Sequence, residues 1–369
     1  MKTKTPLSAL NRFLIAIAAL LAANMPALAV DLYWDANGAT AGTGGSGLWS
    51  TSGNLWRTNS SSGTLGTWLN TGSNNAYFEG TAGFVTNGST TIALGGGTAF
   101  FNTTGYTLRT DGTSSRTLNG NISIGSGLTL NFNNDATTAS RTLNVGGNIS
   151  GGTFAILGSQ TGNNSSRINI SAANSVVSSA LVLSNSSTGN SALVATATGV
   201  GVTGTINLAG GVGTIGATSG NGITLSNTAV ISGSGTLMFA AGSSGGAGTV
   251  TINSQSTYTG RTIFNAGNTG VIRSGTNNAL GTNGADMAFS SGNGGIFDLN
   301  GFNQTFASIS SGAGGGGVRN SAAGTTSTLS INGDATNTTF GLVMQDSGTG
   351  ILAFSKSGTG TITLSGPNT

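Results

Sequence analysis

The residue types that support acid–base, nucleophilic or metal chemistry are scarce in this sequence. Its 369 residues include no histidine and no cysteine, so the commonest proton shuttle, metal ligand and thiol nucleophile are missing. Glu79 is the single glutamate, and Lys356 is the single lysine beyond Lys4. Acid–base catalysis on a repetitive β surface would need carboxylates or basic groups gathered on one face. We therefore predict no catalytic residue and no enzymatic activity in this segment.

The aspartates support the same prediction through their spacing. The pairs Asp286/Asp298 and Asp334/Asp346 have the same separation in sequence. One turn of a stacked β repeat takes roughly 20 to 25 residues, about twice that separation, so the spacing favours opposite faces. If one turn were as short as this separation, the two carboxylates of each pair would lie on the same face. That arrangement would suit a polysaccharide-degrading β-helix, which is the weaker alternative.

Two clusters near the N-terminus could bind a ligand. Asp31, Asp35 and Asn37 alternate as oxygen ligands do in calcium loops, but the later glutamate is missing and Asp35–Gly38 reads as an ordinary turn. We expect the turn and assign no cofactor and no metal ligand.

All four tryptophans fall in one short stretch: Trp34, Trp49, Trp56 and Trp68. If their rings are exposed, they could contact a glycan. If the rings are buried, they could form the core of a cap, and this is the interpretation that we favour.

The N-terminal segment 1–29 has the features of a secretory signal peptide. Lys2, Lys4 and Arg12 precede an apolar run at 13–23, and Ala27 and Ala29 fit a cleavage site directly after Ala29. Three of the 12 Lys and Arg residues lie in this leader, so nine basic and nine acidic residues remain. A neutral, charge-poor chain argues against nucleic acid as a partner, because phosphate binding needs clustered cations.

The rest of the chain has the pattern of an all-β protein. Short runs such as 90–94, 128–132 and 361–364 alternate apolar residues with Thr, Ser or Asn, and they are separated by Gly- and Asn-rich turns. The segment 248–257 matches 360–369 at a constant offset. Repeated units that bury a face only by stacking predict a parallel β-helix, or β-solenoid, and chirality favours right-handed winding. We expect residues 30–83, with their aromatic side chains, to cap its first turn.

At these repeats the sequence resembles a known family. The segment 354–369, FSKSGTGTITLSGPNT, is similar to the autotransporter-associated β-strand repeat, also called the passenger-associated transport repeat. Segment 257–262 resembles the continuation of that motif, and 34–38 resembles the start of many large proteins of this type. The positions that carry the resemblance are Lys356, Gly358, Gly360, Leu364, Gly366, Asn368 and Thr369.

The resemblance implies a passenger of a Gram-negative autotransporter. We expect a signal peptide at 1–29, a cap at 30–83 and a solenoid at 84–369 with degenerate repeats near 231–267 and 344–369, truncated after Thr369. The implied function is structural or adhesive at the cell surface, with repeats that assist export and folding. The alternative is a carbohydrate-binding surface protein that uses the tryptophan cluster. The implied partners are outer-membrane export machinery or a C-terminal β-barrel beyond this segment, and surface polysaccharide or neighbouring and host cells.

Overall fold

The computed structural model describes residues 29–368, except 39, 41, 112–114, 134–139, 159–164, 186–188, 242–247, 268, 282–285, 293, 313 and 334–336. The predicted signal peptide therefore lies outside the described residues, apart from Ala29. Asp334 and Thr369 lie outside them as well. In the described part every regular element is a β-strand, and no helix there is long and apolar enough to cross a membrane.

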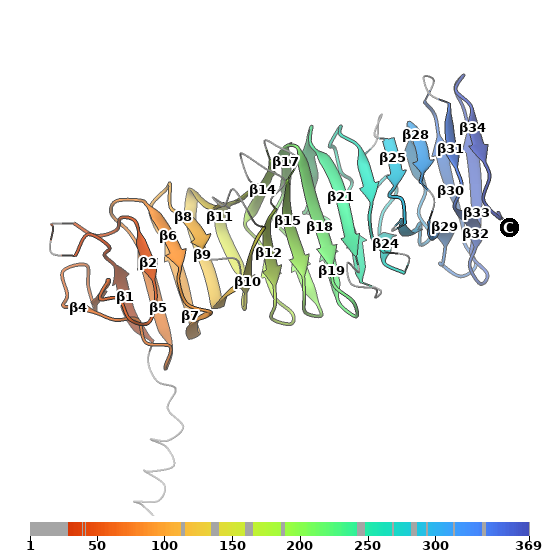
Figure 1. Cartoon of the computed structure of the whole chain (residues 1–369). Coiled ribbons are helices and arrows are strands. Elements are labelled where there is room, and N and C mark those ends of the chain that lie inside the picture. Colours follow the sequence, from red (N-terminus) through yellow and green to blue (C-terminus); the bar gives the residue numbers. More distant parts are fainter. Residues whose placement is uncertain are drawn as a thin grey trace, which may run out of the picture.

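The strands stack into a parallel β-solenoid, as the alternating pattern predicted (Figure 1). The chain progresses from one end of an elongated body to the other, and each turn, here called a rung, pairs with the rungs before and after it. Successive strands fall into three columns that run along the body. Stacking suits this sequence because a short strand with one apolar face gains burial and hydrogen bonds from its neighbours. The winding sense remains a prediction.

The first column contains β1 (Val30–Trp34), β5 (Asn74–Phe78), β13 (Val176–Val177), β16 (Val200–Val202), β19 (Gly222–Leu225), β22 (Thr249–Ile252), β24 (Val271–Ser274), β26 (Gly295–Asp298), β29 (Gly316–Asn320) and β32 (Val343–Asp346). The second contains β2 (Gly47–Trp49), β6 (Phe84–Asn87), β8 (Thr107–Thr110), β14 (Ala180–Ser184), β17 (Ile206–Gly210), β20 (Ile231–Gly233), β27 (Gln304–Phe306), β30 (Thr326–Ile331) and β33 (Ile351–Lys356). The third contains β10 (Arg141–Val145), β12 (Ser166–Ile170), β15 (Asn190–Ala195), β18 (Val212–Ala217), β21 (Thr236–Ala241), β23 (Thr262–Phe264), β25 (Asp286–Phe289), β28 (Ser308–Ser311), β31 (Thr338–Phe340) and β34 (Ile362–Leu364). Three long strands bend between columns: β7 (Thr91–Phe101) and β11 (Ile149–Leu157) each span two columns, and β9 (Arg116–Asn133) spans all three.

The length of a rung varies along the solenoid. From β5 onward, register partners are closest in sequence at Asp298↔Arg319 and farthest apart at Ile149↔Val177. The longest rungs exceed the upper limit of roughly 25 residues that we expected for one turn. Turns between strands absorb the difference, so the register of the inward residues is kept while the corners change length.

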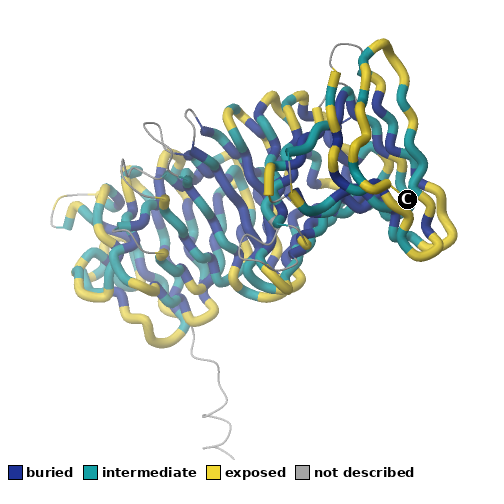
Figure 2. Tube along the Cα trace, turned by 45° about the vertical axis from the view of Figure 1, so that its right-hand side comes forward, coloured by how far each residue is buried: buried dark blue, intermediate teal, exposed yellow. Residues whose placement is uncertain are grey.

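The core consists of inward side chains stacked in columns (Figure 2). In the first column Val200, Ile223, Val250 and Ile272 lie in register on consecutive rungs, and each is at most 1% exposed. Burying one such side chain contributes about 1.5–3 kcal/mol. Exposed residues gather at the corners between strands, where the backbone turns.

The N-terminal end departs from simple stacking. Strand β3 (Trp56–Thr58) pairs antiparallel with both β1 and β4 (Leu65–Gly66), whereas β1 pairs parallel with β5. The parallel register thus already begins inside residues 30–83, and the antiparallel pair β3–β4 lies at its outer side. That pair leaves no long unpaired edge on β1, which protects the first rung from edge-to-edge association. A separate capping unit that ends at residue 83 stays a prediction.

Candidate functional site

The four tryptophans form one buried cluster. Trp34, Trp49, Trp56 and Trp68 are each 0–1% exposed. Their rings pack against one another and against Phe78, with centroids 4.8 to 5.9 Å apart. No ring face is open to solvent, so none of the four rings is available to a glycan in the folded chain. Their burial favours the core interpretation, because stacked and edge-to-face aromatic pairs add stability beyond the area they bury.

The acidic residues near the N-terminus are engaged by protein groups. Asp35 is fully buried and forms an ion pair with Arg57, and residues 36–38 form a turn in which Gly38 has a φ of 63°. Asp31 Oδ1 accepts a hydrogen bond from Asn75 Nδ2 at 2.9 Å. Among the described residues no group of three or more acidic side chains could hold a metal ion. The Arg57 guanidinium therefore lies beside Asp35, where a calcium ion would have to bind.

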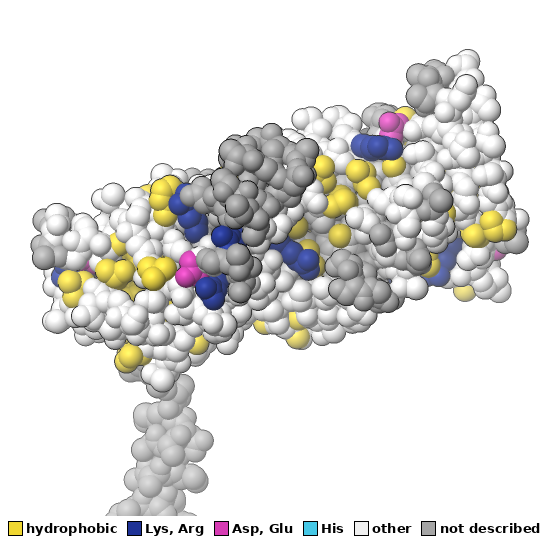
Figure 3. Space-filling model, viewed as in Figure 1, with side chains coloured by type: hydrophobic (Ala, Val, Ile, Leu, Met, Phe, Trp, Pro, Cys, Tyr) yellow, Lys and Arg dark blue, Asp and Glu magenta, His cyan; other side chains and the backbone are white. Residues whose placement is uncertain are grey.

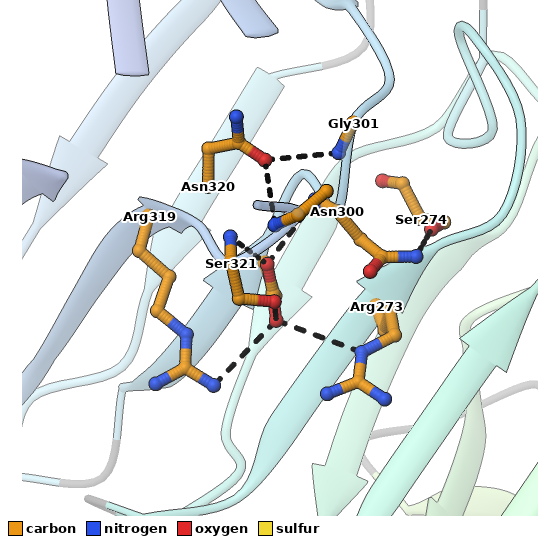
Figure 4. Close-up of polar contacts among 9 residues, drawn as sticks. Arg273, Ser274, Asn300, Gly301, Arg319, Asn320 and Ser321 are labelled. Carbon is orange, nitrogen blue, oxygen red and sulfur yellow. Dashed lines mark hydrogen bonds and ion pairs between the residues drawn. The ribbon is translucent and has the colours of Figure 1, made fainter. Parts of the chain in front are cut away.

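A charged cluster that the sequence interpretation missed lies on the first column. Arg273, Asp298 and Arg319 are in register on β24, β26 and β29. In Figure 4, dashed lines join both arginines to the same carboxylate. The Asp298 side chain is fully buried, with its Oδ2 3.6 Å from Arg273 Nε and 3.5 Å from Arg319 Nη2. Ser321 Oγ donates a hydrogen bond to the same Oδ2 at 2.6 Å.

Backbone groups complete the environment of Asp298. Its Oδ1 accepts hydrogen bonds from the N–H groups of Asn300, at 3.1 Å, and Ser321, at 3.0 Å. The hydrogen bond to Asn300 holds the corner after β26, and the one to Ser321 holds the corner after β29. A carboxylate so saturated with donors is a structural clamp between rungs, since a reactive carboxylate needs a free lone pair. Arg273 precedes Asp298 by the length of one rung, and Arg319 follows it by one rung. This spacing of opposite charges in the sequence is the signal that could have identified the cluster.

Among the described residues, the remaining aspartates do not gather into a catalytic pair. Asp286 lies on β25 in the third column and Asp298 on β26 in the first, so the two belong to different faces, as their spacing suggested. Asp346 Oδ1 accepts a hydrogen bond from the Leu352 N–H at 2.7 Å. The pair Asp334/Asp346 cannot be placed as a pair, because Asp334 lies outside the described residues.

The repeat motif has a clear structural role. Lys356 ends β33, and its Nζ donates hydrogen bonds to the carbonyls of Gly333 at 3.4 Å and Gly358 at 3.2 Å, which joins two rungs. Asn368 Oδ1 accepts the Met344 N–H at 3.0 Å, again one rung back. At Gly366 a Cβ atom would lie 2.2 Å from the Leu342 carbonyl oxygen, so only glycine fits.

The two copies of the repeat occupy different columns. β22 belongs to the first column and pairs with β24, whereas β34, which has the similar sequence, pairs with β31 in the third. The offset between the copies is therefore not a whole number of rungs. The similarity reflects a shared strand–turn–strand pattern that each column accepts.

A second aromatic feature lies on the outer face of the first column. Tyr33, Tyr77 and Phe100 are register partners on three consecutive rungs, and all three are partly exposed. Their rings stack, with centroids 4.9 Å apart at both steps and planes inclined by 14° and 15°. Burial, and then the nearby Asp31 carboxylate, raise the pKa of Tyr33 and of Tyr77, so both phenols are neutral.

The aromatic ladder ends at an open hollow. The register partner of Phe100 on the next rung is Ser123, followed by Ser150, so the stack gives way to small hydroxyl side chains. The hollow has a volume of about 380 Å³. It is lined by Thr98, Phe100, Asn121, Ser123, Asn148, Ser150, Val176 and Ser178.

Comparison with known proteins points to one class. The chain is 48% identical over 84 residues to the adhesin BmaC autotransporter of Brucella suis biovar 1 (strain 1330). The matched segment covers 22% of this chain and 2% of that adhesin. No protein-family model matches the sequence, and no solved structure matches the chain. A parallel β-solenoid that carries this similarity fits the passenger of an autotransporter.

Proposed function

We propose that this chain is a structural and adhesive segment of a cell-surface passenger, without catalytic activity, in a Gram-negative bacterium. The observation that carries the proposal is the stacked parallel register from β5 to β34, combined with the similarity to an autotransporter adhesin. A rod of this kind holds a binding surface away from the cell, since each rung is supported by its neighbours and needs no disulfide.

The outer surface supports contact with polar, uncharged partners. Among the described residues on the face in Figure 3, charged side chains are few, and uncharged side chains and backbone predominate. Ladders of amides and hydroxyls follow the columns. For example, Asn169 Nδ2 donates a hydrogen bond to Asn144 Oδ1 on the preceding rung, at 2.8 Å. We propose polysaccharide or the surfaces of neighbouring or host cells as partners and exclude nucleic acid on the basis of charge.

Adhesion is tested with the folded chain itself. Beads coated with the purified chain should attach to an epithelial-cell monolayer in several-fold excess over beads coated with the same chain after thermal unfolding. Attachment equal to that of the unfolded control would contradict the adhesive role, because both coatings have the same composition.

The repeats supply the second part of the proposal, assistance in export and folding. Folding of a solenoid can nucleate locally and propagate rung by rung. Lys356 and Asn368 fasten a rung to its predecessor, which favours propagation in one direction. The proposed route uses a signal peptide at 1–29 and the outer-membrane export machinery.

Surface display of the complete protein in its own bacterium tests this part. Lys356→Ala combined with Gly366→Ala should lower the fraction of passenger that external protease reaches on intact cells. Ser355→Ala alters an exposed side chain on the same strand and should leave that fraction unchanged. Equal display of both variants would show that the motif does not assist export.

A further inference from the structure

We propose that the hollow beside Phe100 binds a segment of a neutral polysaccharide, with the Phe100 ring as the wall and the amides and hydroxyls of the next rungs as the floor. This inference deepens the proposed adhesive function by naming the ligand class and its site. It replaces the buried tryptophans, which cannot reach a glycan, with an aromatic surface that can.

The wall is a rigid aromatic face. One side of the Phe100 ring is covered by Tyr77, which in turn stacks on Tyr33. Among the described residues no aromatic ring covers the other side, and Phe100 lines the hollow there. The face of an aromatic ring carries negative electrostatic potential and attracts the weakly positive C–H groups of a sugar ring. Because the ladder behind it is already stacked, Phe100 loses little side-chain freedom when a sugar binds.

The floor presents hydrogen-bond donors in a fixed orientation. Asn121 Oδ1 accepts the Asn148 N–H at 2.9 Å, and Asn148 Oδ1 accepts the Val176 N–H at 2.8 Å. These bonds fix both amide planes and leave the Nδ2 groups for a ligand, because no described residue accepts from them. Ser123 and Ser150 add hydroxyls that can donate or accept. Sugar hydroxyls need this combination of partners.

The size of the hollow fits a polymer better than a single sugar. Its lining residues lie on four consecutive rungs, from Phe100 through Ser123 and Ser150 to Ser178. Adjacent parallel strands are about 4.8 Å apart, so the hollow, from the Phe100 wall to Ser178, extends over about 14 Å along the solenoid. The volume of about 380 Å³ lies within the range of small-molecule sites.

Charge selects a neutral ligand. None of the lining residues is charged. The charges that act on the ladder are the carboxylates of Asp31 and Glu79, which contribute to the raised pKa of Tyr33 and Tyr77. An acidic polysaccharide would find no cation in the lining to pair with, and single-stranded nucleic acid would lack the cationic groove that its backbone requires.

The test uses the purified chain, cellohexaose as a neutral probe and a hexamer of galacturonate as an acidic one, with binding measured by calorimetry. Wild type should bind cellohexaose and bind the acidic hexamer at least about tenfold more weakly. Phe100→Ala should weaken cellohexaose binding about tenfold, since the stacking wall is lost. Phe84→Ala, at an exposed phenylalanine of β6 outside the lining, should bind as wild type does.

A second variant separates binding from folding. Ser123→Phe adds one more ring to the ladder at its natural 4.9 Å spacing and fills the floor, so it should fold and fail to bind. Wild-type affinity in both Phe100→Ala and Ser123→Phe would overturn the inference. No binding of cellohexaose to wild type would overturn it too, as would tighter binding of the acidic hexamer. Attachment of coated beads to cells is measured separately, so adhesion without cellohexaose binding rejects only this site, and binding without adhesion rejects only the proposed function.

Discussion

The rings of Phe78 and Phe101 lie parallel, with centroids 4.4 Å apart and planes inclined by only 3°. The two residues are register partners on β5 and β7, and both are fully buried. Phe78 also contacts three of the four tryptophans, so this pair joins the aromatic cluster to the regular stack of rungs.

We expect Phe78→Ala to lower the free energy of unfolding by about 3–5 kcal/mol, because it leaves a cavity where the cluster meets the stack. Chemical denaturation monitored by tryptophan fluorescence measures the change. The matched control is Phe84→Ala: the residue is 44% exposed, the Arg109 guanidinium covers one face of its ring, and the substitution should cost about 1 kcal/mol at most. Equal losses in the two variants would show that the cluster does not depend on Phe78.

The Asp298 clamp provides the second prediction. Asp298→Ala should destabilise the chain by about 3 kcal/mol, because Arg273 and Arg319 lose their buried partner and Ser321 loses its acceptor. Hydrogen exchange should accelerate mainly in β24, β26 and β29, since stability in a solenoid is local. Asp286→Ala removes an exposed carboxylate and should cost less than about 1 kcal/mol. Uniform acceleration along the whole rod would argue against a local clamp.

Two buried tyrosines predict a loss of stability in alkali. Burial raises the pKa of Tyr106 and of Tyr258 above the usual 10, and the Tyr106 hydroxyl donates to the Glu79 carbonyl at 2.7 Å. The folded state therefore holds these protons more tightly than the unfolded chain does. Their contribution is complete below about pH 10 and is lost as pH rises, by at most about 1.4 kcal/mol per pH unit for each tyrosine.

Denaturation curves between pH 8 and pH 11 measure this slope. Tyr106→Phe should lose about 1 kcal/mol at pH 8, where the hydrogen bond is removed, and should decline less steeply than wild type above pH 10. Tyr258→Phe should flatten the slope in the same way. A slope that neither substitution changes would mean that other groups cause the alkaline loss.

Close approach of rungs makes one glycine of the earlier repeat essential. At Gly260 a Cβ atom would lie 2.0 Å from the Gly235 carbonyl oxygen, so Gly260→Ala should cost about 1–3 kcal/mol. At Gly222 the nearest atom to such a Cβ is 3.6 Å away, so Gly222→Ala should change stability by less than about 0.5 kcal/mol. Thermal unfolding of both variants decides the matter, and a tolerated Gly260→Ala would mean that the rungs can separate at this corner.

The sequence by itself determined the fold class and the character of both faces. Alternation in segments such as 128–132 has a period of two, and that local pattern places Leu130 and Phe132 inward while Thr129 and Asn131 face outward. Glycine and asparagine at the corners follow from local backbone geometry, as at Asn174 with a φ of 57°. The similarity to an adhesin autotransporter agrees with the class that the repeat motif suggested.

Only the tertiary structure decided which residues meet across rungs. Rung length varies along the chain, so the partner of a given residue depends on corner lengths accumulated from the N-terminal end. For this reason the Asp298 clamp was missed, and the aromatic ladder from Tyr33 to Phe100 could not be recognised, because its two steps differ widely in sequence separation. The tryptophans show the same limit: their clustering was visible in the sequence, but their burial follows from the antiparallel strands β3 and β4 at the N-terminal end.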